Sequence, residues 1–325
     1  MFESKCVITP ALKQRFCKDA GLNIKIFEEP LFSNMLSLYD AQFGAIEKYR
    51  KFIALVDKLG GEGEYFRAYE AVKDAAITYL NENEDMMYFS REEDMSKFEC
   101  QNKNFKSTDI YINPNVGRVF LSIDMKKGNF TSLRHYNSKI VDNCSTYEEF
   151  LGKFTEEEYF KNSKYIRQVI FGNVNPRRQT TYEKYLMDTV LTKLLEFVDK
   201  DAIAFFATDE IVVDLTDRYA DKSGVINLDF WCKVQNLVKD MVEQGINIRA
   251  EAFILGKISE TSGFVKKFIF GDKKYDLKCV DYLTMPFVLR FLNNEEPKEE
   301  DSVFVYEGRK AKLLDIPKID IVYHV

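Results

Sequence analysis

Acidic residues stand at two points where the surrounding sequence is otherwise apolar. Asp124 ends the run VFLSID, and the pair Asp209-Glu210 interrupts AIAFFATDEIVVDL, residues 202–215. The second stretch predicts a tight hairpin with mostly buried strands and an exposed acidic tip. Carboxylates on neighbouring strands suit two metal ions about 4 Å apart, which can activate an attacking hydroxyl and stabilise a leaving pyrophosphate. Asp124 and Asp209 are therefore the candidate catalytic residues, and with Glu210 they are the candidate ligands of Mg²⁺ or Mn²⁺.

A basic helix is predicted between these two points, in the segment KNSKYIRQVIFG, residues 161–172. Positions three and four residues apart share one face of a helix. This face contains Lys161, Lys164, Tyr165, Gln168 and Phe171, with Arg167 at its edge. Cations beside an aromatic ring could bind a triphosphate and a base together, so we expect a nucleotide to lie along this helix.

Taken in order, these three segments resemble the palm domain of template-directed polymerases, most nearly that of family B DNA polymerases. The first motif of that family is a strand that ends in Asp, as at Asp124, and Asn129 or Phe130 would lie near the aromatic sugar gate. The second is K-x6-Y-G on a fingers helix. Lys164 to Gly172 keeps this spacing, with Phe171 in place of Tyr.

The family's third motif is Y-G-D-T-D-S at a hairpin tip. Residues 205–210 resemble it and keep its second Asp as Asp209. A later K-K-x-Y signal, which contacts the primer end in the family, resembles Lys273-Lys274-Tyr275. The similarity covers roughly residues 111–278.

The resemblance implies a metal-dependent nucleotidyltransferase that adds nucleotides to the 3′-hydroxyl of a nucleic acid, with Mg²⁺ or Mn²⁺ as cofactor. Its partners would be a nucleoside triphosphate, a primer or template strand and other replication proteins. The residues expected to bind the nucleotide are Lys164, Arg167, Gln168, Phe171 and Phe130. Those expected to bind nucleic acid are Lys273, Lys274 and Tyr275.

The chain also departs from the family pattern. Ala207 replaces the first Asp of the hairpin motif, residues 126–130 read KKGNF where the family has Ser-Leu-Tyr, and no exonuclease motif is visible. The short spacing from Asp124 to Lys164 leaves room only for small fingers. These departures leave an alternative function open, that of a catalytically inactive palm-fold protein that binds or scaffolds a viral replication complex.

Each candidate residue also fits an ordinary structural role. Acidic residues such as Asp209 are common in turns, and Asp124 could cap the helix that follows it. Lys164 and Arg167 could form a solvated helix face. Phe171 fits a core position, and the lysines at 273 and 274 could protect an edge strand.

Composition narrows the class of protein. A chain of 325 residues with 46% hydrophobic content can bury a large core in one or two domains. Its net charge of −6 means that any nucleic-acid contact must use a local basic surface. The only histidines are His135 and His324, which argues against a histidine base or metal site.

Location is predicted from what the sequence lacks. The six cysteines form no C-x-x-C pair, and neither a long apolar run nor a leader is visible. We expect a cytoplasmic protein that does not associate with membranes. The abundance of Lys, Asn, Phe, Tyr and Ile, as in AT-rich coding sequence, hints at a virus or phage.

The order of the predicted helices and strands indicates an α+β fold. We expect a polymerase-like palm, an antiparallel sheet with helices on one face. Patterning predicts helices over 35–59 and 64–83, a linker over 84–105, and a hairpin around 113–117 whose second strand ends at Asp124. Helices are expected over 129–140 and 145–172, from Pro176, and up to Gly245. Strands are expected over 246–258 and 263–278, then a short helix, a solvated acidic loop over 293–302 and a strand-like end. The expected domains are an N-terminal helical region (1–105), a palm-like domain (106–292) with a small fingers insertion (about 137–175), and a C-terminal extension (293–325).

Overall fold

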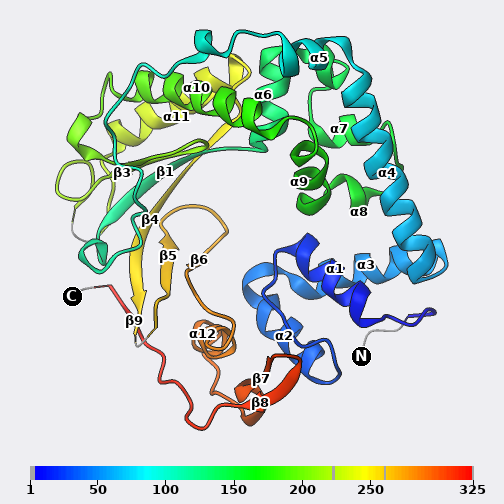
Figure 1. Ribbon diagram of the computed structural model, residues 1–325. Coiled ribbons are helices and arrows are strands. Elements are labelled where there is room, and N and C mark those ends of the chain that lie inside the picture. Colours follow the sequence, from blue (N-terminus) through cyan, green and yellow to red (C-terminus); the bar gives the residue numbers. More distant parts are fainter. Residues whose placement is uncertain (1–3, 222–223, 260, 324–325) are drawn as a thin grey trace.

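The computed structural model describes residues 4–221, 224–259 and 261–323, so His324 lies outside the described residues. The fold combines helices with an antiparallel sheet, which confirms the α+β class (Figure 1). The strand order of the main sheet is β2-β3-β1-β4-β5-β6, and β9 pairs with the end of β4. Its strands are β1 (Val119–Met125), β2 (Ile203–Phe206), β3 (Glu210–Asp214), β4 (Ile248–Ile258), β5 (Phe264–Phe268), β6 (Tyr275–Lys278) and β9 (Ile321–Val322). A separate hairpin is formed by β7 (Val303–Tyr306) and β8 (Arg309–Lys312).

The helices fall into two groups. Those nearest the sheet are α6 (Gly128–Tyr136), α10 (Pro176–Leu194), α11 (Leu228–Glu243) and α12 (Met285–Leu292). The second group is α1 (Pro10–Ala20), α2 (Leu31–Phe43), α3 (Ala45–Leu59), α4 (Glu62–Glu82), α5 (Glu84–Arg91), α7 (Tyr147–Leu151), α8 (Glu158–Lys161) and α9 (Lys164–Gly172). In this group α9 contacts α1 and α4, and α8 contacts α3. The segment expected to form the fingers therefore packs on the N-terminal helices.

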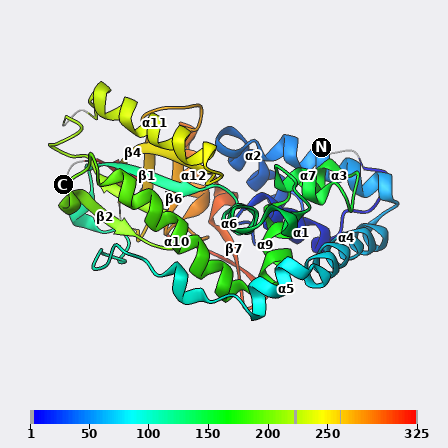
Figure 2. The ribbon, with the colours of Figure 1, turned by 90° about the horizontal axis from the view of Figure 1, so that it is seen from above.

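The two faces of the main sheet differ in character. Leu121 and Ile123 of β1 point into the large core that α10 and α11 complete, and Figures 1 and 2 show these helices along that side. Because side chains alternate along a strand, Ser122 and Asp124 point to the opposite face. We call this second side the open face, although its middle is buried by a smaller apolar cluster of Ile110, Phe120, Val212, Phe253, Leu255 and Phe264. Its polar side chains, placed by the strand register, include Ser122, Asp124, Glu210, Arg249, Glu251 and Lys266.

Figure 1 shows the elements following one another around a ring. The ring closes where α12 contacts α2, and there Asn293 Nδ2 donates to the carbonyl oxygen of Leu38 at 3.1 Å. The sheet and the N-terminal helices are thus joined on both sides of the ring. Within the described part of the chain, no helix is both long enough and apolar enough to cross a membrane.

Local backbone chemistry explains where the elements differ from the sequence pattern. The helix expected over 35–59 is broken at Gly44, whose left-handed φ of +57° ends α2. The expected linker contains α5, capped by the side chain of Asn83, which accepts from Met86 N. Residues 113–115 form a 3-10 turn rather than the tip of a hairpin, because Asn115 Nδ2 donates to Ile110 O at 2.8 Å and holds the turn.

Later segments differ for similar reasons. The helix expected over 145–172 is the three short helices α7, α8 and α9. The strand expected over 263–278 is the β5–β6 hairpin, which turns at Gly271 with a φ of +88°. The loop over 293–302 is not fully solvated, because Asp301 is buried against Arg290, with Nε to Oδ2 at 3.0 Å.

Candidate metal and nucleotide site

Asp124 and Asp209 lie close together because β1 and β3 are neighbouring strands. In their antiparallel register Asp124 is opposite Glu210, the residue that follows Asp209. The N–H of Met125 donates to the carbonyl oxygen of Asp209 at 2.9 Å, which fixes the tip of the β2–β3 hairpin against the end of β1. The structure therefore brings together the two acidic segments identified in the sequence.

Asp124 is a partly buried carboxylate that forms an ion pair with Arg249. Arg249, opposite it on β4, places Nε 3.0 Å from Asp124 Oδ2 and 3.6 Å from Glu251 Oε2. Burial raises the pKa of Asp124, Arg249 opposes this shift, and the charges of Asp209 and Glu210 raise the pKa further. Negative charge at this end of the sheet is thus only partly balanced.

Glu210 is turned away from Asp124, toward the middle of the open face. Its Oε1 accepts from Ser122 Oγ at 2.5 Å and lies 3.6 Å from Nζ of Lys266. The Lys266 side chain is almost fully buried, with Nζ 4.5 Å from the centroid of the Phe253 ring. Burial lowers the pKa of Lys266, and the charge of Glu210 raises it. The contacts of Glu210 connect strands across the sheet, so this geometry gives less support to its role as a metal ligand.

Glu183 of α10 is a further acidic residue near the hairpin tip, and the sequence did not single it out. Burial raises the pKa of Glu183 to about 7, and the charge of Asp209 adds to this shift. Its carboxyl group packs on the turn after β1, because a Cβ built on Gly128 would lie 3.4 Å from Glu183 Cδ. No motif surrounds Glu183, and only the packing of α10 reveals its position.

Cations from two elements flank the ring of Tyr147. The Arg167 guanidinium of α9 lies 5.8 Å from the ring centroid, and Nζ of Lys127 lies 6.0 Å from it. Lys127 also forms an ion pair with Glu148. Among the described residues, Arg167 Nε and the Tyr147 hydroxyl are buried without a hydrogen-bond partner. Lys127, which the sequence reasoning missed, follows Asp124 by three residues and connects the acidic end of β1 to the basic helix.

The remaining candidate nucleotide-binding residues, on α9 and α6, differ in how far their side chains are buried. Lys164 and Gln168 are exposed on α9, where they could reach a ligand. Phe171 and Phe130 are buried, and each has its ring centroid 6.2 Å from that of Tyr147. In this arrangement both rings support Tyr147 from the core, and a base or sugar would reach them only if the side chains around them moved. Their nucleotide-binding role stays a prediction.

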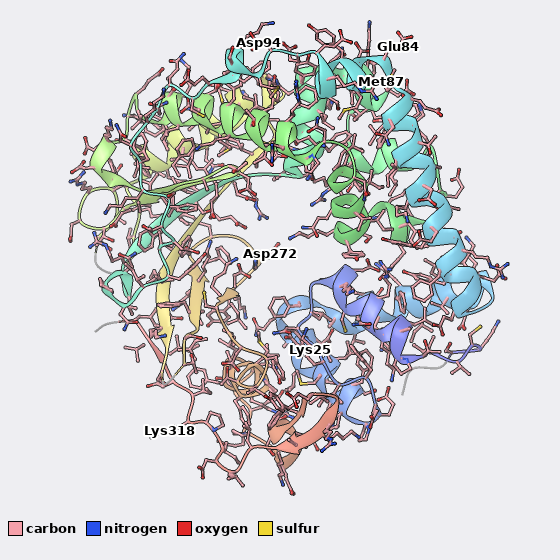
Figure 3. The ribbon with its side chains drawn as sticks, in the orientation of Figure 1. Lys25, Glu84, Met87, Asp94, Asp272 and Lys318 are labelled. Atoms are coloured by element: carbon pink, nitrogen blue, oxygen red, sulfur yellow. The ribbon has the colours of Figure 1, made fainter. Side chains whose placement is uncertain are left out.

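The expected nucleic-acid contacts lie on the β5–β6 hairpin. Lys274 is exposed, Tyr275 begins β6, and Lys273 Nζ lies 3.4 Å from Asp276 Oδ1. Figure 3 shows Asp272 of this turn and Lys25 of the α1–α2 connection on the inner side of the ring of elements. The hairpin belongs to the same sheet as Asp124, with β5 the second and β6 the third strand from β1.

The oxygen donors present fit Mg²⁺ or Mn²⁺. Magnesium commonly takes one or two carboxylates and completes its shell with water and substrate phosphates. Asp124 and Asp209 can supply these carboxylates. Burial chiefly raises the pKa of Asp124, and a cation would relieve the added repulsion from Asp209 and Glu210. Over residues 4–221, 224–259 and 261–323, no group of three or more His, Cys, Asp or Glu side chains is arranged to hold a metal by itself. A site here would thus depend on substrate or water oxygens.

Comparison of the chain with family models, with curated proteins and with solved structures finds no match in any of the three.

Proposed function

We propose that the protein is a metal-dependent nucleotidyltransferase with a polymerase-like palm, which adds nucleotides to the 3′-hydroxyl of a nucleic acid. One observation carries this proposal. The β1 end with Asp124 is hydrogen-bonded to the hairpin tip with Asp209, and Lys127, three residues after Asp124, flanks Tyr147 together with Arg167. Paired carboxylates beside an incompletely paired cationic group are the features that phosphoryl transfer uses.

Each group has a separate task in this proposal. Asp124 and Asp209 hold the divalent cation, which would activate the 3′-hydroxyl and neutralise phosphate charge. Arg167, Lys164 and Lys127 bind the triphosphate through charge-assisted hydrogen bonds. Gln168 lies beside them on the exposed side of α9. The β5–β6 hairpin, with Lys273, Lys274 and Tyr275, contacts the primer strand.

The test is incorporation of labelled deoxy- and ribonucleotides, with and without template, in Mg²⁺ or Mn²⁺. Asp209→Asn removes a ligand charge and should lower incorporation by about a hundredfold or more. The matched control is Asp214→Asn at the other end of β3, where the carboxylate pairs with Arg118 and activity should be kept. Full activity of the Asp209→Asn protein would refute the proposal.

A second function is a palm-fold protein without catalysis, which binds or scaffolds replication proteins. Ala207 in the hairpin and the ion pair of Arg249 with Asp124 favour it. Thermal denaturation with Mn²⁺ and nucleotides discriminates between the two functions, because only a ligand that binds the native state raises its stability. An unchanged melting temperature in all ligand combinations would favour the scaffold.

A further inference from the structure

Arg249 is placed by strand register against the carboxylate that the proposed function needs. It lies directly opposite Asp124 in the β1–β4 pairing, with Nε 3.0 Å from Asp124 Oδ2. About half of its side chain is exposed (48%), against 27% for Asp124. The pair therefore sits at the solvent side of the open face, where side chains can exchange partners.

A second acceptor is already within reach of the same guanidinium. Glu251 is two residues further along β4, so it points to the same face, and its Oε2 is 3.6 Å from Arg249 Nε. Arg249 can thus leave Asp124 without losing an ion pair. The other charged groups near Asp124 are Asp209 and Glu210 of the hairpin. The charges of both residues raise the pKa of Asp124.

The pair is not needed to hold the two strands together. The β1–β4 register runs through seven residue pairs, from Val119 opposite Ile254 to Met125 opposite Ile248. A similar ion pair, Arg118 with Asp214, stands at the opposite end of β1, with side chains 43% and 19% exposed. The Arg118–Asp214 pair can therefore serve as a control. It separates a local effect of Arg249 on Asp124 from the effect of net charge on cation binding.

We propose that Arg249 is a resident counter-ion that competes with the divalent cation for Asp124, and that Glu251 receives Arg249 when the cation binds. This inference rests on the proposed function only in placing a cation at Asp124. A carboxylate oxygen engaged by a guanidinium is less available to a metal, so the strength of the Arg249 contact sets the cation affinity of the site. Loss of Arg249 should strengthen cation binding, and loss of Glu251 should weaken it.

The experiment measures Mn²⁺ binding to the full chain by isothermal titration, without nucleotide or nucleic acid. Arg249→Met should bind Mn²⁺ about fivefold more tightly, the scale expected for losing a partly exposed ion pair. Glu251→Gln should bind about two- to threefold more weakly, by the same reasoning. The double variant should match Arg249→Met, because Glu251 acts only through Arg249.

Controls separate local competition from net charge and from misfolding. Arg118→Met changes the net charge equally and should leave Mn²⁺ affinity unchanged, and Arg249→Lys should stay close to the original protein. If Asp209→Asn abolishes Mn²⁺ binding while Arg249→Met leaves it unchanged or weaker, the competition is refuted and the metal site stands. If neither the original protein nor Arg249→Met binds Mn²⁺ saturably, this inference is refuted. The incorporation assay, in which substrate oxygens can complete the metal shell, then decides the proposed function separately.

Discussion

The balance of charge around Asp209 is decided by single residues that come from different elements. Arg249 reaches Asp124 from β4, Lys266 reaches Glu210 from β5, and Glu183 approaches from α10. Two of these acidic groups have a cationic partner. Burial and the charge of Asp209 both disfavour ionisation of Glu183, so this residue should make stability depend on pH.

Glu183→Gln should therefore stabilise the metal-free protein at neutral pH. The folded-state pKa of Glu183 is raised to about 7 from an ordinary value of 4.5. Below pH 4.5 the carboxyl is protonated in both states and carries no penalty. Between pH 4.5 and 7 the unfolded state ionises while the folded state keeps its proton, so the free energy of unfolding falls across this range and levels off above pH 7. Relative to the original protein, the variant should therefore gain about 3 kcal/mol in the free energy of unfolding between pH 4.5 and 8.

Urea denaturation in a chelator at several pH values measures this difference. The exposed Glu196→Gln, near the end of the same helix, is the control and should follow the original protein at every pH. A constant offset between Glu183→Gln and the original protein from pH 4.5 to 8 would contradict the argument.

At the scale of elements, α9 depends on its first residues for both its shape and its place. Ser163 Oγ accepts from Ile166 N at 3.1 Å, which caps the helix, and donates to Asp19 Oδ1 of α1 at 2.8 Å. Asp19 is also an acceptor for the hydroxyls of Tyr65 and Tyr159. The same hydroxyl thus starts α9 and ties it to the N-terminal helices.

Ser163→Ala should lower the free energy of unfolding by about 1–2 kcal/mol, because a cap and a buried hydrogen bond are lost together. Amide hydrogen exchange should also quicken over the first turn of α9. Ser163→Thr keeps the hydroxyl and should recover most of the stability. Equal stability of the Ala variant and the original protein would show that the backbone at this turn is held by other contacts.

The sequence predicts the parts of the site that depend on neighbouring residues in the chain, but not those that depend on contacts between distant segments. The hairpin around Asp209 and the strand before Asp124 follow from local apolar patterning, and so does the start of α10 at Pro176. Lys127, Glu183 and Arg249 could not be predicted, because their positions come from packing and register between segments far apart in the chain. The aromatic side of α9 was expected to meet a base, but Phe171 lies in the core, since helical spacing does not say which face is covered.

On the scale of the whole molecule, an acidic protein must bind a polyanion through a small basic surface. The net charge is −6, so long-range attraction does not favour nucleic acid. The β5–β6 hairpin is suited to a local contact, because Lys274 is exposed and Figure 3 shows Asp272, two residues earlier, on the inner side of the ring. Within that hairpin Lys273 is already near Asp276, so Lys274 is the residue to test.

Lys274→Ala should weaken binding of a primer-template duplex about three- to tenfold at 0.1 M salt, to a similar extent for different sequences. A phosphate contact releases bound counterions, so its loss should also reduce the salt dependence of binding by about one in the log-log slope. Fluorescence anisotropy of a labelled duplex across salt concentrations measures both quantities. Lys239→Ala removes the same charge from α11, which covers the other face of the sheet, and should leave both unchanged. A contact through the hairpin requires that only Lys274→Ala weakens binding. If both variants lose affinity equally, with equal log-log salt slopes, then net charge rather than the hairpin governs duplex binding.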